Sequence, residues 1–185
     1  MEPAGTIWTV GHSTRTLDEF VGTLETYDIE LIVDVRRFPG SRRLPQFGAA
    51  ELEAGLAKNH IAYKWLPSLG GRRQALPDSP NTAWTHPAFR GYADHIATEE
   101  FAEGLEELLV LSGGLRTAIM CAEVLWWRCH RRIISDVLVT LGYDVIHIRE
   151  STFSEQHKLS SPAKLVDGEL SYLPDSAFQL GLGIG

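Results

Sequence analysis

Short apolar runs alternate with segments of helical spacing through the first 150 residues, and this alternation limits the fold more than any other feature. Residues 31–35 form a nearly continuous apolar run, which is typical of a parallel strand buried on both faces. Between this run and the one at residues 6–10, Leu17, Phe20 and Leu24 recur at helical spacing. Strands that alternate with helices predict a parallel sheet with right-handed crossovers.

We therefore predict an α/β fold with a single doubly wound, mostly parallel sheet and helices on both faces. The five predicted strands lie at residues 6–10, 31–35, 61–66, 117–121 and 143–148. The α/β domain is expected to span residues 1–150, and residues 151–185 form a short C-terminal extension in which Asp167 and Gly168 predict a hairpin turn and the glycine-rich end forms a loose tail. The connection at residues 67–87 is longer than most loops that join two secondary-structure elements, so we expect a lid or another functional loop there.

Charge and apolar patterning exclude several classes of protein. The net charge of −7 and the isoelectric point near 5.5 argue against a generally basic nucleic-acid coat. No apolar run approaches the roughly 18 residues of a membrane span, and the first residues lack the pattern of a signal peptide. We therefore expect a cytoplasmic protein with no membrane partner. Without a Gly-x-Gly-x-x-Gly fingerprint after the first strand or a Gly-Lys-Ser/Thr loop, ordinary dinucleotide or ATP use is unsupported.

Arginine outnumbers lysine among the 17 basic residues, since only Lys58, Lys64, Lys158 and Lys164 are lysines. Most arginines fall into three groups, which are Arg36, Arg37, Arg42 and Arg43, then Arg72 and Arg73, then Arg128, Arg131 and Arg132. The planar guanidinium suits bidentate recognition of phosphate or carboxylate. The alternative is that these arginines are ordinary solvated surface residues.

Polar and reactive side chains follow three of the predicted strands, at the edge of the sheet where ligands bind in open α/β folds. They are His12 and Ser13 after the first strand, Asp34 and Arg36 at the second, Cys121 and Glu123 at the fourth, and Cys129, His130 and Arg131 at the start of the following helix. A doubly wound sheet would bring these three segments to one edge.

The same segments carry a family resemblance. The motifs are Val10-Gly11-His12-Ser13, Asp34-Val35-Arg36 with Pro39 and Ser41, Pro45-Gln46-Phe47, Leu69-Gly70-Gly71-Arg72, Met120-Cys121-Ala122-Glu123 and Cys129-His130-Arg131. In this order the chain resembles the domain-of-unknown-function family DUF488 over about its first 150 residues. The resemblance implies an α/β bacterial or archaeal protein and brings no agreed activity with it. One departure lies between the cysteines, where members usually have an acidic residue or proline and this chain has Val124-Leu125-Trp126-Trp127.

Acid–base roles fall to a histidine and two carboxylates. His12 is a candidate general acid or base, or a residue that holds its loop through a backbone bond. Asp34 and Glu123 could divide the acid and base roles if their surroundings separate their pKa values. Alternatively, Asp34 only pairs with Arg36 or Arg131 and fixes the loop.

The two cysteines are compatible with several chemical roles. Cys121 is a candidate nucleophile with His130 or His12 as its base, or a small apolar filler at a strand end. The seven residues between Cys121 and Cys129 match neither a redox motif nor a zinc ribbon, so no cofactor is evident. Zinc held by Cys121, Cys129, His130 and one distant ligand stays an alternative.

The remaining candidates would bind a ligand. The segment from Cys129 to Arg131 opens a helix, whose free N–H groups favour an anion. The phosphate-binding candidates are Ser13, Arg36, Ser41, Arg42, Arg72, Cys129, His130 and Arg131. Trp126 and Trp127 lie beside arginines and could stack a base, or they complete the core or an interface.

These observations favour an enzyme, a hydrolase or group transferase, that acts on a phosphate-bearing nucleotide or nucleic-acid substrate. One alternative is a cysteine-dependent sulfurtransferase or thiol redox protein. Another is a noncatalytic protein that binds nucleotides or nucleic acid. The sequence does not indicate the oligomeric state.

Overall fold

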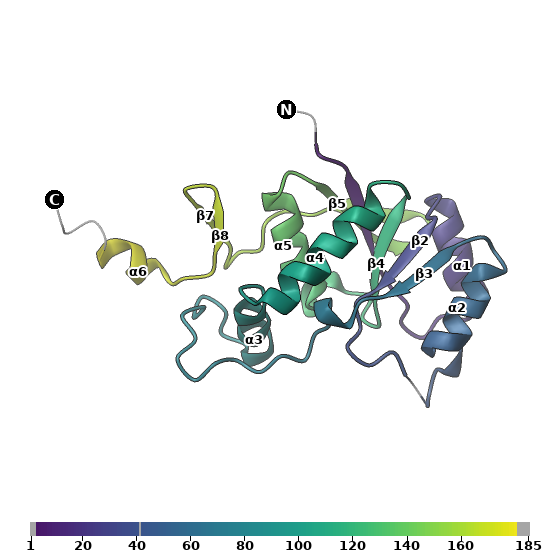
Figure 1. The fold of residues 1–185 in the computed structure, drawn as a ribbon, viewed down its shortest axis with the longest axis horizontal. Coiled ribbons are helices and arrows are strands. Elements are labelled where there is room, and N and C mark those ends of the chain that lie inside the picture. The colour runs from purple at the N-terminus through teal and green to yellow at the C-terminus, as the bar shows by residue number, and fades with distance from the viewer. Residues whose placement is uncertain (1–2, 41, 181–185) are drawn as a thin grey trace.

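The computed structural model describes residues 3–40 and 42–180, and its centre is a six-stranded sheet in the order β3-β2-β4-β1-β5-β6. The first five strands of this order run parallel, and β6 runs antiparallel to β5 (Figure 1). The strands are β1 (Thr6–Gly11), β2 (Leu31–Asp34), β3 (Ala62–Trp65), β4 (Thr117–Cys121), β5 (Asp144–Glu150) and β6 (Phe153–Gln156). The predicted α/β fold with a mostly parallel sheet is confirmed.

Helices cover both faces of the sheet, because each face of the central strands is apolar. The helices are α1 (Leu17–Thr26), α2 (Ala49–Ala57), α3 (Pro87–His95), α4 (Glu99–Ser112), α5 (Arg131–Thr140) and α6 (Asp175–Leu180). Ile32 of β2 packs in one core with Phe20 of α1 and Leu52 of α2. Its neighbour Val33 packs in the other core, to which α3, α4 and α5 contribute. This alternation along one strand separates the two layers of helices.

The sequence predictions hold for all five parallel strands and for the C-terminal hairpin. The hairpin consists of β7 (Lys164–Val166) and β8 (Glu169–Ser171), and its turn residues Asp167 and Gly168 have positive φ angles of 52° and 87°. Such angles are typical of the type I′ turn that an Asp-Gly pair favours. A capping box at Thr16 starts α1.

Three elements among the described residues were not predicted, namely β6, α3 and α6, and the glycine-rich end, where a loose tail was expected, lies outside the described residues. β6 contains one apolar residue, Phe153, so it has no apolar alternation to reveal it. α3 follows the long connection that the sequence marks as a loop. Before α3, that connection contains a single 3-10 turn, η2 (Pro67–Leu69), and otherwise runs without helix or strand through the described residues to His86.

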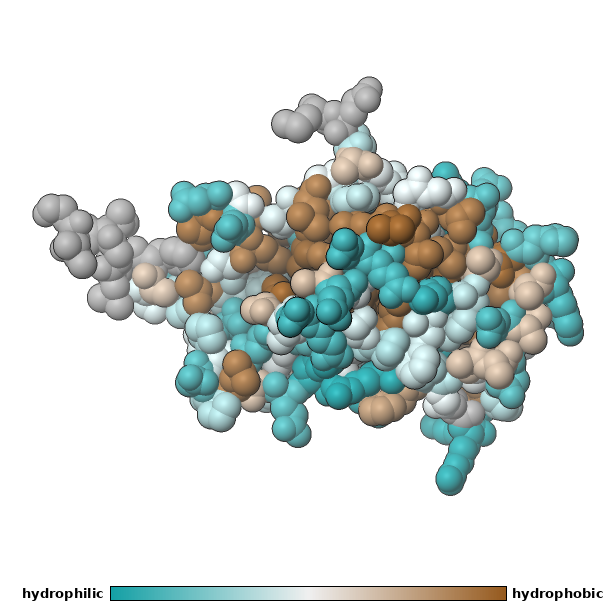
Figure 2. Space-filling model, viewed as in Figure 1, coloured by the Kyte–Doolittle hydropathy of each residue, from teal (hydrophilic) through white to brown (hydrophobic). Residues whose placement is uncertain are grey.

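The surface of α4 is strongly acidic on its outer side. Glu99, Glu103 and Glu106 are exposed there, and Figure 2 shows hydrophilic side chains gathered along this helix. Among the described residues, no helix has both the length and the apolar composition needed to cross a membrane.

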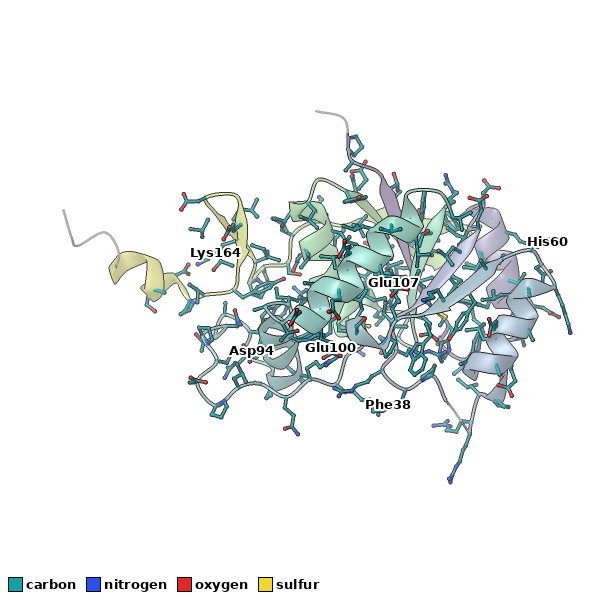
Figure 3. All side chains as sticks on the ribbon, viewed as in Figure 1. Phe38, His60, Asp94, Glu100, Glu107 and Lys164 are labelled. Carbon is teal, nitrogen blue, oxygen red and sulfur yellow. The ribbon has the colours of Figure 1, made fainter. Side chains whose placement is uncertain are left out.

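The strand order determines which segments of the chain meet at one edge of the sheet. β1, β4 and β2 lie side by side in the middle of the sheet, so the segments that follow them leave from the same edge. Phe38, which follows β2, lies at this edge, whereas His60 precedes β3 and lies at the other (Figure 3).

Candidate active site

A cavity of about 800 Å³ opens at the edge where β1, β2 and β4 end. Eight residues proposed from the sequence line it, namely His12, Arg36, Arg72, Cys121, Glu123, Trp127, Cys129 and His130. They come from the ends of β1, β2 and β4, from the connection after β3 and from the approach to α5. The doubly wound topology therefore brings these separate segments to one hollow.

Two thiols and an imidazole form a cluster in the wall of this cavity. The Sγ atoms of Cys121 and Cys129 and a ring nitrogen of His130 all lie within 4.8 Å of one another. The Cys129 Sγ lies 3.5 Å from the His130 Nδ1. Both cysteines are free, and Cys129 is buried while Cys121 is partly exposed. Nucleophilic, redox and metal-binding chemistry are all open to such a group.

His130 is held in one orientation by its surroundings. Its Nε2 lies 2.8 Å from the carbonyl oxygen of Val35, so Nε2 carries the proton and Nδ1 faces Cys129. Gly71 packs against the same ring, where an added Cβ would come within 2.7 Å of Nδ1. The long connection after β3, which was predicted to be a functional loop, therefore contacts the cluster of Cys121, Cys129 and His130 through Gly71. Glycine has no side chain that would displace the imidazole.

The two thiols differ in their tendency to ionise. Burial opposes ionisation of Cys129, but the hydrogen bond from Cys121 and the neighbouring His130 and Arg131 outweigh it and hold its pKa well below the ordinary value. The same contact with Cys129, together with burial, raises the pKa of Cys121. A single negative charge on the pair therefore resides on Cys129.

His12 lies in the cavity wall as a neutral ring. Its Nδ1 donates to the carbonyl of Ser13 at 2.8 Å, and its Nε2 accepts from the guanidinium of Arg36 at 3.2 Å. Burial, followed by the charge of Arg36, lowers the pKa of His12 to about 4. The ring also stacks on Phe47 with centroids 4.1 Å apart. Because its lone pair is already occupied by Arg36, His12 is a weak base in this arrangement.

Asp34 lies beneath the cavity and does not line it. Its carboxylate is fully buried, pairs with the Arg36 guanidinium at 2.5 Å and accepts from the Tyr63 hydroxyl at 2.7 Å. The Arg36 backbone N–H also donates to it at 3.0 Å. With these donors in place, Asp34 fixes the direction of Arg36.

Arg131 also points away from the cavity. Its fully buried guanidinium donates to Thr9 Oγ1 and to the carbonyl oxygens of Glu123 and Val124. At Gly11 an added Cβ would come within 2.0 Å of the same Glu123 carbonyl, so only glycine permits this close packing. Arg131 and Gly11 together hold the loop after β4 in place.

The two tryptophans have different positions. Trp127 lines the cavity, and the Arg149 guanidinium lies 4.9 Å from its ring centroid. Trp126 stacks on the buried His147 with centroids 4.1 Å apart, and its indole N–H donates to Glu155. Only Trp127 is therefore placed to contact a ligand in the cavity.

The remaining predicted residues fall outside the cavity lining. The Ser13 backbone N–H donates to the Ala122 carbonyl, and Ser13 has a positive φ of 51°. Arg42 is exposed and does not line the cavity. Ser41 lies outside the described residues.

Several residues that line the cavity were not predicted from the sequence. Arg37 and Arg128 belong to the arginine groups, and their positions beside Arg36 and Cys129 were the available signal. His86 and Tyr92 come from the segment that includes α3. The only sequence feature that indicated this segment was the unusual length of the connection before α3. Within the described part of the chain, Arg37, Arg72 and Arg128 form no ion pair, so their charges face the cavity region uncompensated.

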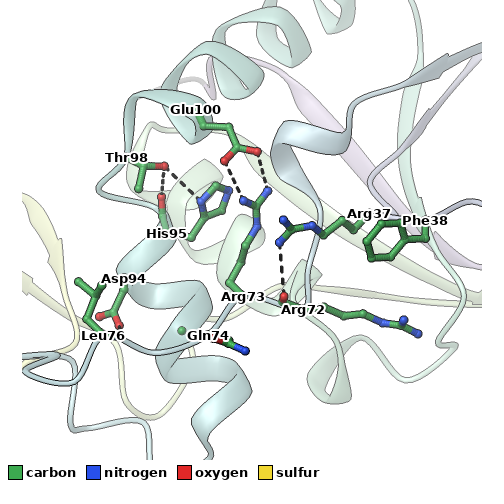
Figure 4. A pocket seen from close by; sticks show the side chains of 11 residues that line it. Arg37, Phe38, Arg72, Arg73, Gln74, Leu76, Asp94, His95, Thr98 and Glu100 are labelled. Carbon is green, nitrogen blue, oxygen red and sulfur yellow. Dashed lines mark hydrogen bonds and ion pairs between the residues drawn. The ribbon is translucent and has the colours of Figure 1, made fainter.

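A second hollow of about 540 Å³ adjoins the cavity and shares Arg37, Phe38 and Arg72 with it (Figure 4). Arg73, which also lines this second hollow, is paired with Glu100 through two hydrogen bonds of 2.8 Å. No cysteine lines this hollow in the described residues, so the reactive cluster belongs to the larger cavity.

Comparison with known protein families gives a match to this chain. The family described as "Domain of unknown function DUF488" matches residues 16–138, which is more than half of the chain. No curated protein and no solved structure shows significant similarity to it.

Proposed function

Because the chain belongs to the DUF488 family, whose function is unknown, we propose an activity from the cavity itself. The protein is a hydrolase or group transferase that acts on a phosphate-bearing substrate, a nucleotide or a segment of nucleic acid. The observation that carries the proposal is that one cavity is lined both by arginines without ion-pair partners among the described residues and by the cluster of Cys121, Cys129 and His130.

The arginines would bind the substrate. Arg37, Arg72 and Arg128 come from three different segments, so they can approach an anionic group from several sides. Arg36 lies deeper, and its direction is fixed by Asp34. Trp127 offers an aromatic face to a base or another planar group.

Glu123 would transfer protons. It is the one carboxylate among the described residues that line the cavity. Its side chain is exposed, and Oε1 accepts from the backbone N–H of Leu125 at 3.1 Å, which orients the group. Asp34 has no part in this step, because its oxygens are occupied by Arg36 and Tyr63.

The contact between Cys121 and Cys129 supports a second candidate, a sulfurtransferase or thiol redox protein. Two free thiols at this distance could form a disulfide or pass a sulfur atom between them. Both candidates suit a reducing compartment such as the cytoplasm, where thiols stay reduced. A thiol redox role requires that mild oxidation converts both cysteines into one disulfide, and failure of this oxidation in the folded protein would eliminate that redox role.

The leading proposal is tested by calorimetric binding of pyrophosphate and nucleoside diphosphates, followed by turnover assays with the same compounds. Arg72→Gln should weaken binding about tenfold, which corresponds to about 1.4 kcal/mol. Arg43→Gln is the matched control, since Arg43 is exposed and does not line the cavity. Equal affinities of the two variants would contradict the proposed binding site, and binding without turnover of any phosphate compound would favour the noncatalytic alternative.

A further inference from the structure

We propose that Cys121, Cys129 and His130 bind a zinc ion in the wall of the cavity, with the fourth coordination position left for water or a substrate oxygen. The inference deepens the proposed function and rests on it only for the identity of the fourth ligand. The binding of the metal itself follows from the geometry of the three side chains.

The spacing of the donor atoms fits a tetrahedral zinc ion. Zn–S and Zn–N bonds of about 2.3 Å and 2.0–2.1 Å at the tetrahedral angle separate the sulfur and nitrogen by about 3.6 Å. The Cys129 Sγ and His130 Nδ1 lie 3.5 Å apart. Cys121 brings its sulfur within 4.8 Å of both. Rotation of the partly exposed Cys121 side chain about χ1 would adjust the position of its sulfur to the tetrahedral distance.

The types of donor also select zinc. Thiolate and imidazole are the ligands that zinc prefers, whereas calcium and magnesium require oxygen. Two thiolates would repel each other in this buried wall, and a dication between them neutralises both charges. A neutral His130 adds no charge, so the loaded cluster has a net charge of zero.

His130 has the outer contact that metal-binding histidines usually have. A ring nitrogen that binds metal is normally oriented by a hydrogen bond from the other nitrogen to a carbonyl or carboxylate. Here Nε2 donates to the Val35 carbonyl at 2.8 Å. Tyr92 packs at a centroid distance of 5.0 Å from the ring and is itself anchored by its hydroxyl to the Leu69 carbonyl. The protein alone therefore orients the donor atom Nδ1 toward the thiols, without the help of a bound metal.

The fourth position is supplied by the cavity, since all three donors line it together with the arginines. Three protein ligands with one exchangeable position are typical of catalytic zinc sites, whereas structural sites have four. A phosphate group held by Arg72 and Arg128 would lie in the same hollow as the ion. Zinc would then polarise an oxygen of that group or activate a bound water.

The test uses the full chain, stripped with a chelator and titrated with zinc against a chromophoric competitor. One zinc per chain is expected. Cobalt(II) in the same site should give the intense thiolate-to-metal absorption of tetrahedral coordination. Cys121→Ser and His130→Gln should each weaken zinc binding by more than about 100-fold, the upper range for loss of an outer contact alone. His60→Gln is the control, because His60 is exposed at the opposite edge of the sheet (Figure 3).

The wild-type titration decides the inference even if a variant fails to fold. Absence of zinc binding at micromolar concentration, or cobalt spectra without thiolate bands, would overturn it. Pyrophosphate binding is measured separately on the metal-free chain. If pyrophosphate binds in the cavity and zinc does not, the zinc inference fails while the proposed function stands. If zinc binds and no phosphate compound does, the proposed function fails instead.

Discussion

The Nε2 of His130 donates a hydrogen bond of 2.8 Å to the carbonyl oxygen of Val35. This bond links the start of α5 to the segment after β2, and it leaves Nδ1 directed at Cys129. Because a backbone carbonyl rather than a mobile side chain sets the ring, the thiol–imidazole contact is built into the packing of the sheet edge.

Gly71→Ala should damage the cluster without unfolding the protein. The new Cβ would lie 2.7 Å from His130 Nδ1, so the ring must shift. We expect zinc affinity to fall about 10- to 100-fold, as for other changes that disturb a metal-binding histidine. Gly114→Ala is the control, because a Cβ there meets nothing within 4 Å. Unchanged zinc affinity in Gly71→Ala, measured by competition titration, would mean that the ring of His130 does not depend on this close approach.

Asp34→Asn should act mainly on stability. It removes the charge that compensates buried Arg36, and loss of one partner of a buried ion pair costs about 3–5 kcal/mol. Urea unfolding measures this change, with Asp78→Asn, an exposed carboxylate, as control. A variant of wild-type stability that has lost turnover would instead identify Asp34 as a direct participant in the reaction.

Glu123→Gln should strongly slow turnover and preserve binding. The carboxylate lines the cavity, and loss of a general acid or base typically slows a reaction about 10²- to 10⁴-fold. Pyrophosphate affinity should stay near the wild-type value, because an amide removes no cation. Glu106→Gln on the outer face of α4 is the control. Parallel loss of binding and turnover in a folded Glu123→Gln variant would argue against the catalytic role.

Acid should destabilise the protein through His147. Its Nδ1 contacts Thr9 Oγ1 and its Nε2 contacts His157, while Trp126 covers the ring. Burial, followed by the charges of His157 and Arg131, lowers its pKa from 6.5 to about 2. Below pH 6.5 the unfolded chain therefore binds a proton that the folded chain does not, so stability falls as the pH is lowered.

The contribution of His147 amounts to about 2 kcal/mol at about pH 5. His12 acts in the same direction. Urea midpoints at neutral pH and at about pH 5 measure the total effect. His147→Gln, which cannot take up a proton, should show a smaller loss on acidification than wild type. An identical pH dependence would show that the His147 ring is protonated in the folded state.

The sequence was informative about the fold wherever burial leaves a pattern. The run at residues 31–35 predicted a strand covered on both faces, and Asp167-Gly168 predicted a hairpin turn, because each depends on local chemistry. α3 was not predicted, since its apolar residues Phe89 and Tyr92 are few and the helix depends on packing against distant elements.

Within the site, position along the chain was predictable and side-chain direction was not. Residues after strand ends do line one cavity, as His12, Cys121 and His130 illustrate. Nothing in the sequence shows that Arg131 turns inward to Thr9 and the loop after β4, because the contact with Thr9 spans 122 residues. The hydrogen bond from the Tyr63 hydroxyl to the Asp34 carboxylate also joins residues distant in the sequence, so it could not be predicted from the sequence either.

The most direct test of the account is whether a ligand in the cavity protects the Cys121 and Cys129 thiols from alkylation. The rate of iodoacetamide labelling of the metal-free chain is measured with and without saturating pyrophosphate, and again in Arg72→Gln. We predict that pyrophosphate slows labelling of these two thiols in the wild-type chain and protects the variant less at the same concentration. If pyrophosphate leaves the labelling rate unchanged while calorimetry shows that its binding is saturated, the anion binds elsewhere. That result would contradict the claim that the arginines and the thiols line one cavity.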